Sequence, residues 1–344
     1  MRILCMDCEG PITLNDNAFE LCAHFLPQGE AFFSLVSMYD DYCTDAYVEN
    51  GYRPGTTLAF IVPFLKAHGL DNQRIKTFSR ETLAFVPGAL DMIRNAQEML
   101  PLYVISTSYR AYIEAMAEAS CLPLEHTFST SVDFAFTMEQ EECNRVLALY
   151  EELTTMRLEH LSQRNTSELR EEPTIKRLDE IFFQELPRMQ CGSSIKRTLP
   201  VGGTQKKRAI QQIAVKHGVP HREIMYTGDS ITDTSALRFL HREGGCSISF
   251  NGNAHAVRAA EFAYISSEAS MLIPIIKSFV SGGTTEVRHL ASTWLSHMDK
   301  PDSTTLPQHN AIFTRVNQTN MEMILRLSQQ RRCELRGTKR GKLG

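Results

Sequence analysis

Residues 2–11 read RILCMDCEGP, a short apolar run followed at once by two acids and two turn residues. The run 2–6 contains β-branched and sulfur side chains, which is typical of a buried strand, and Gly10-Pro11 favours a turn. Asp7 and Glu9 would then lie at the carboxyl end of that strand, where open α/β sheets bind ligands. Such a stretch by itself more often only ends a strand, so its meaning depends on the rest of the chain.

The composition is that of an ordinary globular chain. Of its 344 residues, 42% are hydrophobic and 22% are charged, which is enough for one large core or for two domains. The formal net charge of −4 gives no general attraction to nucleic acid or to anionic membranes, so we expect neither as a partner.

The nine cysteines are scattered and show no repeated metal-ligand spacing, which indicates a reducing compartment. Cys5 and Cys8 form a CxxC pair, but it lies within the predicted strand rather than at a helix start, which disfavours a redox site. Asp7 and Glu9 interrupt any N-terminal signal segment, and the apolar stretch 271–280 is too short to span a bilayer. We therefore expect a cytoplasmic protein.

Further apolar runs at 102–105, 223–227 and 247–250 alternate with helical patterns, which predicts an α/β fold with a doubly wound parallel sheet. Polar residues follow two of these runs. Ser106 and Thr107 come after the first, where backbone N–H groups at a helix start favour an anion, although helix capping explains them too. Asp229 and Asp233 come after the second, again at a strand end.

The remaining segments predict the domain organisation. We expect an α/β core from residues 1–12, 84–127 and 200–280, a helical cap at 13–83 that begins with Asn17 as N-cap, a helical insertion at 128–199, a C-terminal helical extension at 281–330 with helices near 286–298 and 320–329, and a disordered basic tail at 331–344. The insertion could select the substrate, pair with a copy of itself, bind another protein or only add packing.

These polar groups together suit phosphoryl transfer. An aspartate can act as the nucleophile, hard carboxylate oxygens suit Mg²⁺, and a lysine and a hydroxyl can hold phosphate oxygens. Lys206, at the start of the helix that follows residue 203, is the expected lysine, with Lys207 as its competitor.

The order Asp-x-Glu-Gly, strand–Ser, Lys, Gly-Asp-x-x-x-Asp resembles the haloacid dehalogenase (HAD) superfamily of phosphohydrolases, and most closely its phosphoserine phosphatase-like branch. The likeness covers roughly residues 1–127 and 200–280. It implies a HAD-like Rossmannoid core, the cofactor Mg²⁺ and a small phosphorylated metabolite as substrate.

The resemblance also implies a role for each matching residue. Asp7 matches the nucleophile, and Glu9 matches the general acid/base whose backbone carbonyl binds the metal. Ser106 and Lys206 match the pair that holds the phosphate. The remaining matches are Asp229 and Asp233 at the metal, and Thr107 and Asp16 at the substrate. Helix capping explains Asp16 equally well.

Two departures from the family pattern bear on the rate. Glu9 is one methylene longer than the usual aspartate, although the Asp-x-Glu-Gly variant resembles a bacterial phosphoserine/homoserine phosphotransferase of this branch. Pro11 has no N–H to offer a phosphate. A Mg²⁺-dependent phosphatase is therefore the leading hypothesis. The alternatives are a phosphotransferase of the same chemistry and a HAD-like partner-binding protein with little turnover.

Overall fold

The computed structural model describes residues 1–47, 52–158, 170–294 and 311–341, and within them a seven-stranded sheet of order β3-β2-β1-β4-β5-β6-β7. The strands are β1 (Ile3–Met6), β2 (Leu102–Tyr109), β3 (Thr127–Thr130), β4 (Ile224–Gly228), β5 (Cys246–Phe250), β6 (Phe262–Ile265) and β7 (Ile312–Arg315). Neighbours are parallel except β7, which runs antiparallel to β6. The predicted α/β class is confirmed, and the sheet is mostly parallel rather than entirely so.

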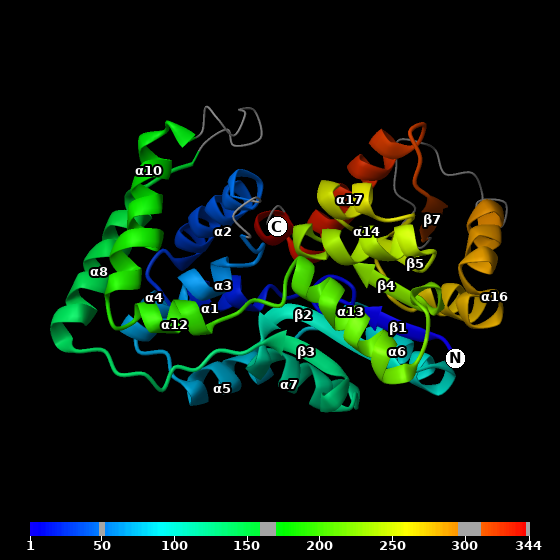
Figure 1. Ribbon diagram of the computed structural model, residues 1–344, viewed down its shortest axis with the longest axis horizontal. Helices are drawn as coiled ribbons and strands as arrows, with labels where there is room; N and C mark the ends of the chain where they lie inside the picture. The colour runs from blue at the N-terminus through cyan, green and yellow to red at the C-terminus, as the bar shows by residue number, and fades with distance from the viewer. Residues whose placement is uncertain (48–51, 159–169, 295–310, 342–344) are drawn as a thin grey trace.

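Helices cover both faces of this sheet, as the doubly wound prediction requires (Figure 1). Leu4 and Met6 of β1 pack with helices α6 (Ala89–Met99), α7 (Arg110–Ser120) and α16 (Leu272–Thr293). Ile3 and Cys5 face the other way. They pack with α13 (Thr204–His217), α14 (Thr234–Glu243) and α15 (Ala254–Ala259). Strands β1, β4, β5 and β6 are buried along their whole length, whereas the edge strands β3 and β7 are partly exposed. Burial on both faces explains why the central strands are rich in apolar residues.

The cap and the insertion, which are distant in sequence, share one hydrophobic core and form a single helical unit beside the sheet (Figure 1). Its cap helices are α1 (Asn17–Phe25), α2 (Gly29–Ala46), α3 (Thr57–Phe60), α4 (Val62–Ala67) and α5 (Asn72–Thr82). The insertion adds α8 (Gln140–Thr155), α10 (Pro173–Glu180), a π-helical turn η4 (Ile181–Glu185), α11 (Leu186–Arg188) and α12 (Gly192–Arg197). We call this assembly the helical unit.

Two elements begin or end differently from the sequence predictions. Helix α1 is capped by Asp16, whose carboxylate accepts the Phe19 N–H, so the predicted N-cap Asn17 is already the first helical residue. Strand β2 continues past residue 105 to Tyr109, with an irregular register against β3 between Ile105 and Tyr109. The hydroxyl residues therefore lie within the strand, at an irregularity of the kind that often re-aims side chains beside active sites.

The C-terminal region departs most from the prediction. The extension expected to be helical also contains β7, whose Phe313 stacks on Phe262 with ring centroids 5.4 Å apart. The prediction that the tail from residue 331 is disordered is wrong for the residues that the structure describes. Helix α17 (Met321–Arg336) and the short α18 (Thr338–Gly341) occupy it. Buried ion pairs order this segment, as described below. Residues 295–298 of one predicted helix and 342–344 of the predicted tail lie outside the described ranges.

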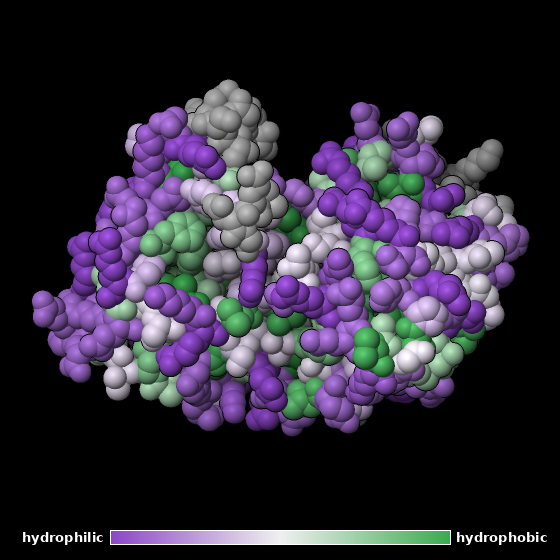
Figure 2. Space-filling model, viewed as in Figure 1, coloured by the Kyte–Doolittle hydropathy of each residue, from purple (hydrophilic) through white to green (hydrophobic). Residues whose placement is uncertain are grey.

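The surface of the face in Figure 2 is mostly polar, with a notch between the helical unit and the sheet at the top of the view. Across the described ranges, no helix combines the length and the apolar character that a bilayer crossing needs.

Candidate active site

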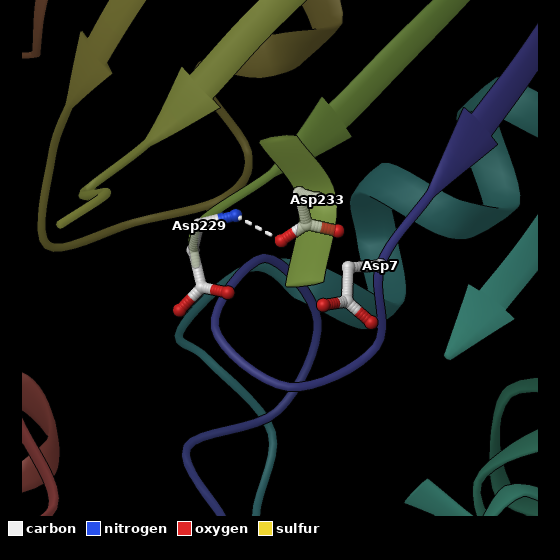
Figure 3. Close-up of side chains that lie close together, drawn as sticks. All are labelled: Asp7, Asp229 and Asp233. Carbon is white, nitrogen blue, oxygen red and sulfur yellow. Dashed lines mark hydrogen bonds between the residues drawn. The ribbon is translucent and has the colours of Figure 1, made fainter. Parts of the chain in front are cut away.

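Asp7 and Asp229 follow β1 and β4, two central strands that pair in parallel through Met6 and Thr227 (Figure 3). The strand order reverses direction between these two strands, because β1 leads outward to β2 whereas β4 leads outward to β5. Open α/β sheets bind ligands at such a switch point, beyond the carboxyl ends of the strands. The fold therefore places both acids where the sequence predicted a site.

Lys206, in the first turn of α13, connects two of the aspartates. Its Nζ lies 2.7 Å from Oδ2 of Asp7 and 2.6 Å from Oδ1 of Asp233, and its side chain is fully buried. Burial opposes its charge, but Asp233 and Asp7 outweigh that effect and raise the pKa of Lys206 above its ordinary value. Lys207, the competing candidate, instead places its ammonium over the ring of Phe239. The geometry thus brings Lys206, and not Lys207, to Asp7.

Both carboxylate oxygens of Asp233 accept hydrogen bonds. Its Oδ1 accepts from Lys206 and, at 2.5 Å, from the Tyr226 hydroxyl, while Oδ2 accepts the backbone N–H groups of Asp229 and Ser230 at 2.9 Å each. Burial opposes its ionisation, but Lys206 and these hydrogen bonds outweigh it, so the pKa of Asp233 lies below its ordinary value. With both oxygens engaged, Asp233 positions Lys206 and the turn at Asp229 rather than offering a free ligand atom.

Asp7 is held less completely. Its Oδ1 accepts the Cys8 N–H at 2.7 Å, and its Oδ2 faces Lys206. Burial raises the pKa of Asp7 to about 7, with Lys206 acting against this shift and the charges of Asp233 and Asp229 adding to it. Burial thus makes the ionised form of Asp7 costly in this environment, as expected of a carboxylate that is to react.

Glu9 connects the loop after β1 to the cap. Its Oε1 accepts the backbone N–H of Asn17 at 2.7 Å, at the first turn of α1. Burial, together with the nearby charge of Asp16, raises its pKa well above the ordinary value, although Arg336 and the Asn17 N–H act in the opposite direction. The shift makes Glu9 easier to protonate than an exposed glutamate, and the protonated form is the one that can donate a proton.

Ser106 and Thr107 line the same cavity as Asp7, from the irregular part of β2. The Ser106 hydroxyl donates to Ser108 Oγ at 3.1 Å and accepts the Ser108 N–H at 3.2 Å, so its position is fixed by its own strand. The Thr107 hydroxyl donates to the carbonyl of Val201, at 3.3 Å, just before α13. Ser106, Thr107 and Ser108 thus carry hydroxyl groups of the type that binds phosphate oxygens.

The cavity, of about 100 Å³, lies between the sheet and the helical unit. Asp16, Asp40 and Asp41 of the cap line it, together with the site residues above. Asp40 holds the loop before α3 in place by accepting from Gly55 N at 2.9 Å and from Thr57 N at 3.1 Å. The sequence patterns did not single out Asp40 or Asp41 as part of the site, since nothing in a helical pattern tells which face meets the core.

Two further residues of the site, Arg332 and Arg336, come from α17, where the sequence analysis expected a disordered tail. Both line the cavity, and both donate to Oδ2 of Asp229. Their spacing of four residues on one helix face was the only signal available. On the other side of Asp229 lies Gly10, with φ +105°, where a Cβ would be only 2.4 Å from the same oxygen. The loop therefore needs glycine to approach Asp229 this closely.

The donor set suits a divalent cation. Asp7, Asp229 and Asp233 each place a carboxylate oxygen so that all three lie within 4.8 Å of one another, and such hard oxygens are the ligands that Mg²⁺ prefers. Because Asp233 is saturated by its own donors, Asp7 and Asp229 are the carboxylates best able to hold the ion. The arginine partners of Asp229 occupy only its Oδ2, so an ion would bind Oδ1 beside them or displace them from Oδ2.

No family model matches this sequence, and the curated proteins include no significant match. Among solved structures, gene product AF1437 from Archaeoglobus fulgidus is similar over 100% of this chain and 99% of its own, at 25% identity and a TM-score of 0.84.

Solved phosphoserine phosphatases are more distant. A substrate-bound complex and a phospho-aspartyl intermediate analogue give TM-scores of 0.48 and 0.45, each at 10% identity and covering 79% of this chain and 97% of theirs. Superpositions this loose establish no shared activity. The comparisons thus establish the fold along the whole chain, and the chemistry rests on the residues of the site.

Proposed function

We propose that this chain is a phosphohydrolase of the HAD type, which hydrolyses a small phosphomonoester through an aspartyl phosphate on Asp7. The observation that carries the proposal is the buried chain Asp7–Lys206–Asp233 at the switch point of the sheet. A carboxylate in that place, ion-paired on one oxygen and open to a cavity, is suited to attack phosphorus.

The reaction has two displacements. In the first, a carboxylate oxygen of Asp7 attacks phosphorus, the bond from phosphorus to the ester oxygen breaks, and protonated Glu9 gives its proton to the departing alcohol. In the second, Glu9, now ionised, takes a proton from water as the water oxygen attacks phosphorus, and the bond from phosphorus to the Asp7 oxygen breaks. Inorganic phosphate leaves, and Asp7 and protonated Glu9 are regenerated.

The other residues hold the transferring group. The ammonium of Lys206 and the hydroxyl of Ser106 are suited to bind phosphate oxygens, where charge develops in the transition state. Thr107 and Asp16 line the same cavity and are proposed to contact the substrate. Mg²⁺ held by Asp7, Asp229 and the backbone carbonyl of Glu9 would supply positive charge against the phosphate.

The size of the cavity supports a small phosphorylated metabolite as the substrate. The helical unit covers the ends of the strands, and the space of about 100 Å³ leaves room for little beyond the phosphoryl group unless the two units separate. Enclosure of this kind also excludes water that would compete for the active groups.

The test is release of inorganic phosphate from a panel of small phosphomonoesters, with Mg²⁺ and with chelator. We expect turnover by the natural sequence that chelator and Asp7→Asn both abolish. The matched control is Asp91→Asn, at an exposed aspartate on α6 whose carboxylate pairs with Arg94, and it should keep full activity. Mg²⁺-dependent binding of beryllofluoride, which mimics an aspartyl phosphate, detects the reactive Asp7 even where the panel lacks the substrate. Failure of both measurements would refute the proposal.

A second candidate function, a partner-binding protein with little turnover, is favoured by one observation: two arginines already pair with Asp229. The beryllofluoride measurement separates it from the hydrolase. The phosphotransferase alternative is separated by adding an acceptor alcohol, because a transferase would form a new phosphoester at the expense of free phosphate.

A further inference from the structure

Helix α17 places two guanidinium groups on one oxygen of Asp229. Nη1 of Arg332 donates to Oδ2 and, at 3.2 Å, to the backbone carbonyl of the same residue, and Nη1 of Arg336 donates to Oδ2 at 3.2 Å. Both arginine side chains are buried, with 3% and 6% of their surface exposed. Breaking an ion pair this buried would leave uncompensated charges in the site, whereas an exposed surface pair contributes little because water solvates its partners.

The arginines are also held from the side away from Asp229. Arg336 donates to the carbonyls of Asn15 at 2.7 Å and Leu14 at 3.3 Å, in the segment between β1 and α1, and Arg332 donates to the carbonyl of Gly341 at 3.2 Å. Ser328 fixes the same helix to the loop after β5 by donating to the Gly252 carbonyl at 2.7 Å. Helix α17 is therefore bound to the carboxyl edge of the sheet by several independent contacts.

This arrangement competes with metal binding. A carboxylate oxygen has two lone pairs, and Oδ2 of Asp229 accepts from two guanidinium groups, which leaves that oxygen no lone pair for a cation. A cation on Oδ1 of the same carboxylate would share its charge with both arginines. The pair also brings two positive charges, the same charge as a divalent ion, to that position. Asp233 offers no alternative, because its oxygens are saturated by Lys206, Tyr226 and backbone N–H groups.

We propose that Arg332 and Arg336 act as an internal counter-cation that competes with a divalent metal ion for Asp229, so that α17 sets the metal affinity of the active site. The inference rests on the metal site of the proposed function and deepens it. A metal ion on Oδ2 would have to displace both guanidinium groups, and one on Oδ1 would lie beside their two positive charges, so in either case metal binding weakens the hold of the arginines on Asp229. Guanidinium groups displaced from Asp229 can turn into the cavity, because both side chains line it and Arg336 already interacts with the charges of Asp16 and Glu9.

The first test measures Mn²⁺ binding by electron paramagnetic resonance, with Mn²⁺ in place of Mg²⁺ and the full chain throughout. Replacing both arginines (Arg332→Gln with Arg336→Gln) should tighten binding by roughly tenfold or more, the scale on which groups behind metal ligands act. Arg331→Gln is the matched control. Arg331 lies on the same helix but pairs with Glu334 at 2.9 Å, so its loss should leave the affinity unchanged. Asp229→Asn, added to the double variant, should abolish the binding.

The second test needs no substitution, so it still applies if the double variant fails to fold. Hydrogen exchange of the natural sequence is compared with and without saturating Mg²⁺, and we expect faster exchange in α17 when the ion is bound. Two results would overturn the inference and leave the hydrolase proposal standing. One is an equal Mn²⁺ affinity of the natural sequence and the double variant, and the other is unchanged hydrogen exchange in α17 on metal binding. Absence of Mn²⁺ binding in every protein would overturn it as well. The phosphatase proposal is judged separately, by phosphate release and by beryllofluoride binding to Asp7.

Discussion

At the scale of single residues, Lys206 is the side chain on which the site depends most. It lies between two buried carboxylates, at 2.7 Å from Asp7 and 2.6 Å from Asp233, and no part of it is exposed. Removing one member of such a group leaves the others as uncompensated buried charges. Neighbouring Lys207 differs by one position and lies over an aromatic ring near the surface.

Lys206→Met should therefore lower the free energy of unfolding by about 3–5 kcal/mol, because two buried aspartates lose their common counter-charge. Lys207→Met should cost less than about 1 kcal/mol, the scale of an exposed cation–π contact. Urea denaturation of both variants in the same buffer checks the difference. Similar losses in the two would show that the buried ion pairs do not stabilise the fold.

Asp7 gives a prediction on pH. Its pKa is raised from 3.8 to about 7 in the metal-free fold, so over this interval the folded state retains a proton that the unfolded state releases. The contribution of the protonated carboxyl to stability is thus complete below about pH 4 and is lost as the pH rises through about 7. Asp7→Asn, which cannot ionise, removes this dependence.

We therefore expect the unfolding free energy of the natural sequence, measured in chelator, to fall relative to that of Asp7→Asn as the pH rises across this range. Chemical denaturation at several pH values provides the comparison. Parallel curves for the two proteins would mean that Asp7 is ionised throughout, with Lys206 outweighing burial.

At the scale of elements, the π-helical turn η4 joins the insertion to the cap. Phe182 of this turn is buried, with its ring centroid 4.3 Å from that of Phe60 and 5.6 Å from that of Tyr39, whereas the next residue, Phe183, is 44% exposed. Asp179 of α10 accepts hydrogen bonds from two cap tyrosines, Tyr39 and Tyr47. The insertion is thus part of the core of the helical unit.

Phe182→Ala should destabilise the protein by about 3–5 kcal/mol, the usual cost of deleting a buried aromatic ring. Phe183→Ala, a change of the same chemistry one position along, should cost about 1 kcal/mol. Thermal or urea unfolding distinguishes them. If Phe182→Ala unfolds the helical unit alone, two transitions will appear in place of one.

At the scale of the whole molecule, the site lies where two units meet. The strand ends of the sheet provide Asp7 and Asp229, and helix α13 beside them provides Lys206. The helical unit and α17 supply the other residues that line the cavity. Segments from both ends of the chain therefore meet at the carboxylate of Asp229. The helical unit limits the size of the substrate that fits the cavity.

Under the proposed function, kcat/KM should fall as the alcohol part of the phosphomonoester grows. From short alkyl phosphates to nucleoside monophosphates we expect a decrease of roughly a hundredfold, because a substrate displaced by about 1 Å loses that much. Steady-state phosphate release across a graded series measures it. Equal values for small and large esters would show that the cavity does not select by size.

The sequence by itself determined the features that are local. Apolar runs of four or five residues, three of them followed by acids or hydroxyls, predicted the α/β class and brought Asp7, Lys206, Asp229 and Asp233 into one hypothesis. The structure places these four together. The carboxyl ends of parallel strands share one edge of the sheet, which is why residues that follow separate strands could be assigned to one site from the sequence. The catalytic roles of these residues remain predictions.

Only the tertiary structure decided what depends on distant partners. Arg332 and Arg336 appear in the sequence as part of a basic tail, and their meaning arises from Asp229, which precedes them by more than a hundred residues. The same holds for the insertion and the cap, whose apolar faces do not reveal that they bury each other, and for the short β7, which needed β6 beside it to form. A helix pattern shows that a face is apolar or charged, but the free energy of burying it depends on what it meets.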